Sequence, residues 1–226
     1  MRFNPSTTRR DMRLRNCRLI GLGCALIALA FCADAVAQPV ARPEFNVGDT
    51  WTYVYTEGSR HGKPHSYEST WVHTVTRVTS DQYKTTLVVT PEGGESKTTN
   101  PSYTLNWNNL TWPPNPDGSR QEIKREKWPL DVGETYTYEV PAAAGVERWR
   151  AHVVGWETVD VPAGSFRALK VEREMVSSPN PLVYRKITVW WSPEAKTTVR
   201  MYLHGTYEGS FTYQRDTREL VSYSLH

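Results

Sequence analysis

Cysteine is nearly absent from this sequence, and where it occurs it is confined to one end. The 226 residues contain three cysteines, all within the first 37 (Cys17, Cys24 and Cys32). The other 189 residues therefore cannot form a disulfide bond. This excludes the small disulfide-stapled scaffolds and leaves core packing as the source of stability, even in an oxidising compartment.

Outside the N-terminal segment the sequence also lacks an excess of charge of either sign. Residues 1–37 hold six basic and two acidic residues, so the remainder has 21 basic and 22 acidic residues and a formal net charge of −1. A nucleic-acid-binding surface needs a clear excess of Lys and Arg. We therefore expect no nucleic-acid partner.

Amphipathic helical patterns are missing after residue 37. No stretch shows a sustained apolar period near 3.6 with helix caps, whereas apolar and polar residues alternate in many short runs. Two such runs, 206–215 and 217–225, are predicted as separate strands. The pattern predicts an all-β fold of about ten strands, as a curved antiparallel sheet, an open barrel or a sandwich, with little or no helix.

The first 37 residues are typical of an export signal. Six arginines precede an apolar run over 19–31, and Ala35-Val36-Ala37 forms a small-residue cleavage site before Gln38. Phe31 is too large to precede an acylated Cys32. We therefore expect cleavage between Ala37 and Gln38 and a periplasmic or secreted protein without lipid or transmembrane segment; a start at Met12 would leave a shorter signal.

The remaining chain, 38–226, is predicted to form one all-β domain that contains a weak internal sequence repeat. Residues 47–53 (VGDTWTY) return as 132–138 (VGETYTY), at a spacing of 85. Two interpretations are open. The domain is a diverged duplication of 45–127 and 128–226, or the same strand-start chemistry is used twice.

A long hairpin is predicted over 148–176, turning at Val161-Pro162-Ala163-Gly164-Ser165. Pro162 fixes the φ angle that the start of a turn requires, and Gly164 can take the positive φ that closes it. Both residues are predicted to be structural.

Several phrases occur in a fixed order: residues 45–53 (FNVGDTWTY), 128–133 (WPLDVG), 161–171 (VPAGSFRALKV), 190–194 (WWSPE) and 219–223 (ELVSY). Together they resemble a family of exported bacterial domains of unknown function, which is similar in shape to the lipoprotein-localisation carriers. The resemblance spans most of 45–225. It implies a curved antiparallel sheet that can hold an acyl chain and an extracytoplasmic location, and it supplies no catalytic residue.

Candidate reactive residues are few. His61 and His65 are four residues apart, but Gly62 and Pro64 make this a loop, so no metal site is predicted. Ser165 lacks the G-x-S-x-G setting of a nucleophile. Glu172 and Glu174 alternate with Lys170 and Arg173, which favours a solvated face over acid–base catalysis. We expect neither an enzyme nor a cofactor.

Aromatic residues are abundant and give the best binding candidates. All nine tryptophans and all twelve tyrosines lie after residue 37. Neighbouring strand residues point to opposite faces, so one of Trp190 and Trp191 is expected in the core and the other in a cleft, under a loop or on a binding surface. Trp107, Trp112, Trp190 and Trp191 are the predicted ligand contacts.

Three function classes follow. We favour a non-catalytic exported binding or carrier module for an apolar or acyl small molecule. The alternative is an envelope structural or assembly protein that binds a protein partner through its sheet edges. A hydrolase ranks last, because no nucleophile, base and orienting residue occur together.

Overall fold

The computed structural model describes residues 39–58, 67–109, 121–142, 145–206 and 213–226. Within these ranges all regular secondary structure is β-strand, as predicted. The eleven strands are β1 (Thr50–Glu57), β2 (Tyr67–Val78), β3 (Gln82–Pro91), β4 (Lys97–Thr99), β5 (Ser102–Thr104), β6 (Thr135–Ala142), β7 (Gly145–Val161), β8 (Gly164–Ser177), β9 (Arg185–Ser192), β10 (Thr197–Thr206) and β11 (Tyr213–Ser224).

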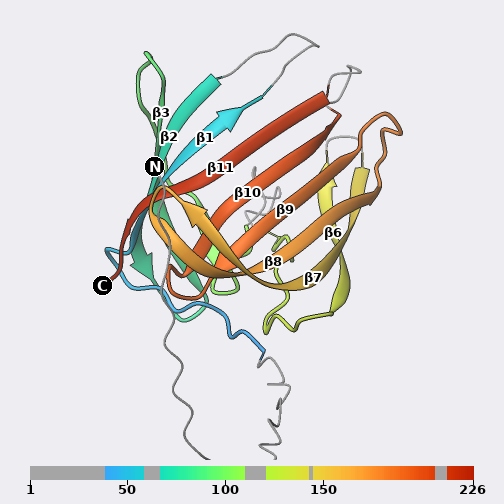
Figure 1. The fold of residues 1–226 in the computed structure, drawn as a ribbon, viewed down its shortest axis with the longest axis horizontal. Coiled ribbons are helices and arrows are strands. Elements are labelled where there is room, and N and C mark those ends of the chain that lie inside the picture. Colours follow the sequence, from blue (N-terminus) through green and yellow to red (C-terminus); the bar gives the residue numbers. More distant parts are fainter. Residues whose placement is uncertain (1–38, 59–66, 110–120, 143–144, 207–212) are drawn as a thin grey trace, which may run out of the picture. The chain divides into compact units, whose positions relative to one another are not determined.

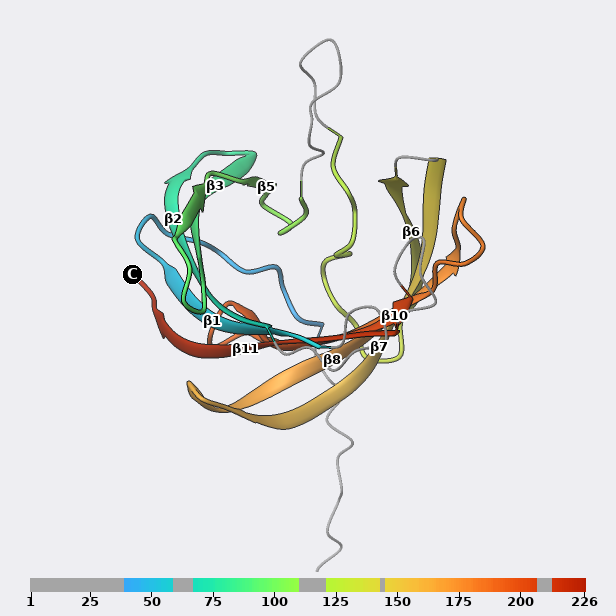
Figure 2. The ribbon, with the colours of Figure 1, turned by 90° about the horizontal axis from the view of Figure 1, so that it is seen from above.

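The strands form one curved antiparallel sheet in the order β4-β3-β2-β1-β11-β10-β9-β8-β7-β6, with β5 also paired to β3 (Figure 1). Successive strands are neighbours on both arms of this sheet. The arms join where the first strand, β1, pairs with the last, β11. The sheet curves around residues 105–109 and 121–134, the described parts of the linking segment between β5 and β6, which therefore lie on its concave side (Figure 2).

The repeated sequence phrase occupies the same structural position in two hairpins. Gly48 and Gly133 both have positive φ, 98° and 87°. The Gly48 amide donates to the Val75 carbonyl at 2.9 Å, and the Gly133 amide donates to the Val153 carbonyl at 2.8 Å. Each glycine therefore turns the chain into the first strand of a hairpin, as expected under either interpretation of the repeat.

The β7–β8 hairpin is the longest in the sheet and closes through Pro162 and Ala163. Val161 pairs with Gly164, whose φ is 134°. The register shifts beside Gly155, and beyond this point the hairpin packs against β10 and β11. The Ala163 amide donates to the Leu220 carbonyl at 3.0 Å, and Arg200 donates to the Asp160 carbonyl. The strands of the hairpin thus extend the sheet, and its tip packs across β10 and β11 of the same sheet.

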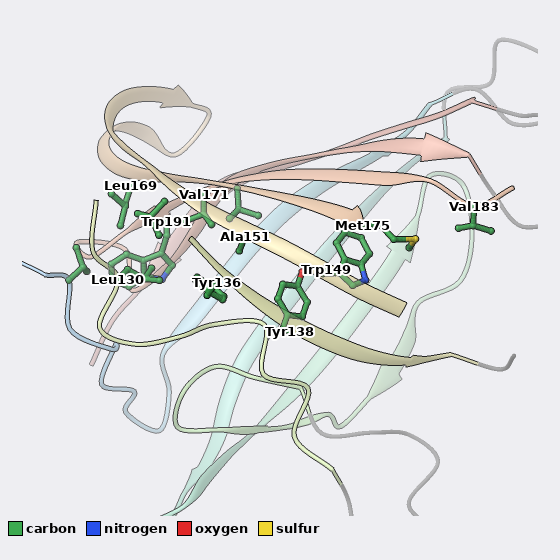
Figure 3. Packing of buried hydrophobic residues seen from close by; sticks show 13 residues of the cluster. Leu130, Tyr136, Tyr138, Trp149, Ala151, Leu169, Val171, Met175, Val183 and Trp191 are labelled. Atoms are coloured by element: carbon green, nitrogen blue, oxygen red, sulfur yellow. The ribbon is translucent and has the colours of Figure 1, made fainter. Parts of the chain in front are cut away.

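Two hydrophobic clusters form the core. The first joins β6 to β9 with the linking segment, and Leu130 and Trp191 lie within it (Figure 3). The Trp128 ring meets the Trp191 ring at 4.9 Å between centroids. The second cluster gathers Phe45, β1 and the tip of the β7–β8 hairpin. Packing of this kind is what a chain without disulfides requires.

One predicted boundary was wrong. We expected separate strands over 206–215 and 217–225, but β11 runs without a break from Tyr213 to Ser224. Asp216, which resembles a turn residue in the sequence, is buried and pairs with Glu57 of β1 and Leu203 of β10. Strand partners on both sides outweigh the local turn preference of the Asp-Thr pair.

Candidate functional site

A cavity of about 590 Å³ opens on the concave side of the sheet. This volume lies within the range typical of small-molecule sites. Strands from both arms contribute, and Trp107, Arg125 and Glu126 come from the linking segment and its flanks. The apolar and aromatic residues that line it are Phe45, Trp51, Tyr53, Trp71, Tyr83, Leu87, Pro101, Tyr103, Trp107, Tyr138, Val140, Trp149, Ile187, Val189, Met201 and Leu203.

Of the four predicted contact residues, Trp107 lines this cavity. Its φ is 62°, and the Trp107 amide donates to the Thr104 carbonyl at 2.9 Å. A left-handed backbone at a bulky residue costs about 1–3 kcal/mol and is found where the surroundings fix it, often at functional sites. Trp112 lies outside the described residues.

Trp190 and Trp191 point to opposite faces, as alternation predicts, yet neither lines the cavity. Both are buried. Trp191 belongs to the first core cluster and Trp190 to the second. The Trp190 indole N–H donates to Glu157 at 2.7 Å, and Tyr202 packs edge-on against its ring. The long β7–β8 hairpin supplies the cover that sequence alternation alone cannot show.

An ion pair crosses the cavity wall between Arg173 of β8 and Glu126 of the linking segment. The two side chains are only 9% and 12% exposed. Burial is the largest influence on Arg173 and disfavours its charged form, but the charge of Glu126, its hydrogen bond and the neighbouring Tyr138 and Tyr136 together hold the pKa of Arg173 above its ordinary value. This pair fastens the linking segment to the sheet.

Glu147 of β7 is the second buried carboxylate of the cavity. It accepts the indole N–H of Trp149 at 3.1 Å and pairs with Arg185 at 3.7 Å. Both glutamates that line the cavity therefore have partners within its wall.

Two further arginines, Arg125 and Arg218, line the cavity and join no ion pair with another described residue. Arg125 lies in the field of Glu126 and Glu147, and burial lowers the pKa of its guanidinium. The Arg218 guanidinium lies 4.8 Å from the centre of the Tyr53 ring. Its Nε is buried and has no hydrogen-bond acceptor among the described residues.

His73 also lies beside the Tyr53 ring. The His73 and Tyr53 rings meet edge-on at 5.9 Å. Burial, followed by the positive charge of Arg218, lowers the pKa of His73 to about 3. Burial raises the pKa of the Tyr53 and Tyr103 hydroxyls. At neutral pH the imidazole is therefore uncharged and the phenols keep their protons.

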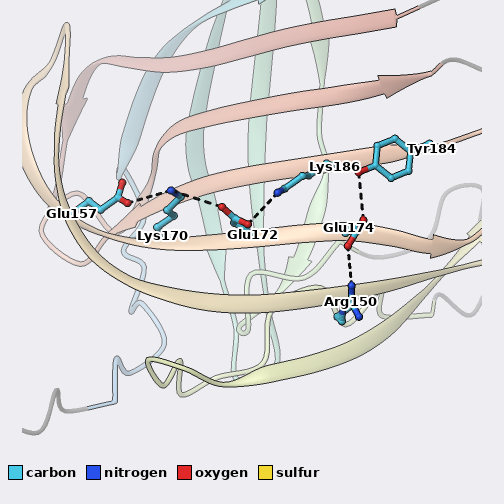
Figure 4. Close-up of polar contacts among 7 residues, drawn as sticks. All are labelled: Arg150, Glu157, Lys170, Glu172, Glu174, Tyr184 and Lys186. Carbon is cyan, nitrogen blue, oxygen red and sulfur yellow. Dashed lines mark hydrogen bonds and ion pairs between the residues drawn. The ribbon is translucent and has the colours of Figure 1, made fainter.

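The opposite face of β7 to β9 is polar and solvated (Figure 4). Lys170 pairs with Glu157 at 3.2 Å and with Glu172 at 3.8 Å, and Arg150 pairs with Glu174 at 2.9 Å. The predicted solvated face is therefore present. The place given to Arg173 on that face was wrong, because Arg173 points inward to Glu126.

The histidine pair and the export signal predicted from the sequence both lie outside the described residues. His61 and His65 lie outside the described residues. In the described ranges, no group of three or more His, Cys, Asp or Glu side chains is arranged to hold a metal ion. Within the same ranges, no helix has the length and apolarity that crossing a membrane requires. The export signal and its Ala37–Gln38 cleavage site also lie beyond the described part, so both stay predictions.

Comparison with known proteins gives only distant similarities. No protein-family model matches the chain, and no curated protein matches it significantly. Among solved structures it is similar to a candidate exported protein with a YmcC-like fold from Bacteroides fragilis, with 13% identity, a TM-score of 0.47 and coverage of 83% of this chain and 100% of that one. A candidate lipoprotein from Parabacteroides distasonis has the same identity and coverage and a TM-score of 0.48. The hypothetical lipoprotein YmcC from Escherichia coli has 13% identity, a TM-score of 0.37 and coverage of 78% and 86%. At these scores the similarities assign neither a family nor a function.

Sequence reasoning missed the charged cavity residues, although a signal for Arg173 was present. Along β8, Val171, Arg173 and Met175 share one face, and the two apolar neighbours are buried. A charged residue between two apolar residues of one face marks a buried ion pair or a site.

Proposed function

We propose that this chain is a non-catalytic exported module that holds a small molecule in the concave cavity. The single observation that carries the proposal is the cavity itself, about 590 Å³ with a wall rich in aromatic and aliphatic side chains. Export rests on the sequence of residues 1–37. The relation to lipoprotein-localisation carriers likewise rests on the sequence phrases, and it would make the ligand apolar or acyl.

The polar groups of the cavity support binding better than catalysis. Glu126 and Glu147 are engaged in the wall, and the Tyr53 hydroxyl shares a hydrogen bond of 2.5 Å with Thr197. His73 has a depressed pKa and lies beside a cation, which disfavours the proton uptake that a general base needs. These groups can orient a ligand without reacting with it.

A second candidate function uses the sheet edge instead of the cavity. β6 is an end strand of eight residues, and in the described ranges it pairs only with β7. Strand addition by a protein partner fits an edge of this kind. It predicts a partner that protects the β6 amides from hydrogen exchange and leaves the cavity empty.

Neighbouring residues on β3 offer a matched test of the cavity. Leu87 lines the cavity, whereas Val88 is absent from its lining and alternation turns it to the opposite face. Leu87→Trp adds a bulky side chain inside the cavity and should weaken binding of the neutral fluorophore N-phenyl-1-naphthylamine by tenfold or more. Val88→Trp should leave its Kd within about twofold. Equal binding of the fluorophore by both variants would contradict the proposal.

A further inference from the structure

The cavity carries more positive than negative charge. Four arginines and two glutamates line it, and His73 is uncharged at neutral pH. Both glutamates are already paired, with Arg173 and Arg185. The excess of two positive charges therefore falls on the remaining arginines, Arg125 and Arg218.

Arg218 is the one of the two with a buried nitrogen that has no acceptor within the described chain. Arg125 lies in the field of both cavity glutamates. Arg218 lies on β11 near the centre of the sheet, between Tyr55 of β1 and Met201 of β10. The carboxylate two residues earlier on the same strand face, Asp216, accepts the Tyr55 hydroxyl at 2.5 Å and is paired in register with Glu57 of β1.

The surroundings of Arg218 make a missing counter-ion costly. One side of its guanidinium rests against the Tyr53 ring, and its buried Nε finds no acceptor within the described chain. A charged group taken from water is stabilised by a partner that accepts hydrogen bonds and carries the opposite charge. Carboxylates, sulfonates and phosphates are such partners, and the planar guanidinium suits them.

We propose that the ligand of this cavity is an amphiphilic organic anion whose head group binds Arg218 and whose apolar body lies along the aromatic wall. This inference rests on the proposed binding function and adds the charge of the ligand. It also assigns the head group to the β11 side of the cavity, beside Tyr53 and His73.

A pair of probes that share one skeleton separates the anionic group from the apolar body. 8-Anilinonaphthalene-1-sulfonate is N-phenyl-1-naphthylamine with a sulfonate added. The unmodified protein should bind the sulfonate at least tenfold more tightly than the neutral compound. Binding of the neutral compound alone, or of both with equal affinity, would overturn the inference while leaving the proposed binding function intact. Failure to bind either would remove both.

Substitutions of Arg218 then test whether this residue binds the anionic group of the probe. Arg218→Met should weaken sulfonate binding by about tenfold to hundredfold, the loss expected for a charge-assisted contact, and leave the neutral probe within twofold. The affinity of Arg218→Lys for the sulfonate should lie between those of Arg218→Met and the unmodified protein. Arg150→Met, which removes an arginine from the solvated face, is the control and should change neither affinity. Loss of both probes together in Arg218→Met, with an unchanged melting curve, would contradict a head-group role.

Displacement in the unmodified protein tests the inference even if the Arg218 variants fold poorly, and it identifies the head group. Dodecanoate or dodecyl phosphate should displace the sulfonate probe, and the better competitor shows whether a carboxylate or a phosphate is preferred. Dodecanol has the same chain without charge and should displace it at least tenfold less well. Equal displacement by dodecanol would overturn the inference.

Discussion

Arg173 and Glu126 link the sheet to the segment inside it, and their burial decides what breaking the pair should cost. Removing one partner of a buried pair leaves the other charged and unpaired, which typically costs about 3–5 kcal/mol. Arg173→Met should therefore lower the free energy of unfolding by that amount in chemical denaturation. Arg150→Met breaks the exposed pair with Glu174, whose side chains are 54% and 40% exposed, and should cost no more than about 1 kcal/mol.

A double variant tests whether the unpaired charge is the cause. Adding Glu126→Gln to Arg173→Met should recover part of the lost stability, because the orphaned carboxylate is gone. Equal destabilisation by Arg173→Met and Arg150→Met would show that the buried pair does not hold the linking segment.

His73 should make stability depend on pH in the acidic range. Its pKa is about 3 in the folded protein, below the ordinary value of 6.5, so the unfolded chain binds a proton first as the pH falls. The contribution of His73 is fully present above pH 6.5. It declines by about 1.4 kcal/mol per pH unit between 6.5 and 3, because the unfolded state binds one more proton there.

The variant His73→Gln isolates this contribution from the carboxylates that titrate in the same range. Urea unfolding between pH 4 and 7 should give a shallower slope for the variant than for the unmodified protein, with the two curves converging toward low pH. Parallel curves would mean that His73 is protonated as easily in the folded protein as in the unfolded chain.

Among the structural elements, the β7–β8 hairpin depends most on a single backbone angle. Gly164 has φ of 134°, a region that side-chain-bearing residues avoid at a cost of about 1–3 kcal/mol, while a Cβ there would meet only Phe166 at 3.9 Å. Gly164→Val should therefore lower the melting temperature through backbone strain alone, by about 2–4 °C for each kcal/mol.

The next residue provides the control for this substitution. Ser165 is exposed, lies within β8 and pairs with Asp160. Ser165→Val adds the same side chain at an ordinary strand position and should leave the melting temperature within about 2 °C. If the two variants melt alike, the turn at Gly164 is not the constraint that the structure indicates.

The strands and turns were predictable because their signals are local. Gly48 and Gly133 follow the same phrase and turn the chain at equivalent places, and Pro162 and Gly164 close the longest hairpin. The cavity was not predictable in this way. Whether Arg173 faces water or Glu126 depends on where a segment nearly fifty residues away in sequence folds, and alternation within β8 does not contain that information.

The same limit applies to the aromatic residues. Alternation correctly placed Trp190 and Trp191 on opposite faces of the sheet. It does not show that the β7–β8 hairpin covers Trp190. Trp107 was selected as a ligand contact from its type alone, and it lies in the cavity wall because β5 and the linking segment return across the concave side. Local patterns define elements, and long-range packing defines the site.

For the molecule as a whole, the first expected outcome concerns its N-terminus. Intact-mass analysis of the exported protein should give a chain that begins at Gln38 without added lipid, because small residues precede that bond and Phe31 precedes Cys32. A diacylglyceryl mass on a cysteine, or a retained leader, would contradict the predicted export route.

Native mass spectrometry of gently purified exported protein shows directly whether the cavity holds a ligand. We expect an added mass of a small organic molecule, released into organic solvent and detected as an anion. Leu87→Trp should lose this mass, and Val88→Trp should retain it. A chain that carries no small molecule in any form, or an added mass that persists in Leu87→Trp, would contradict a binding function for the cavity.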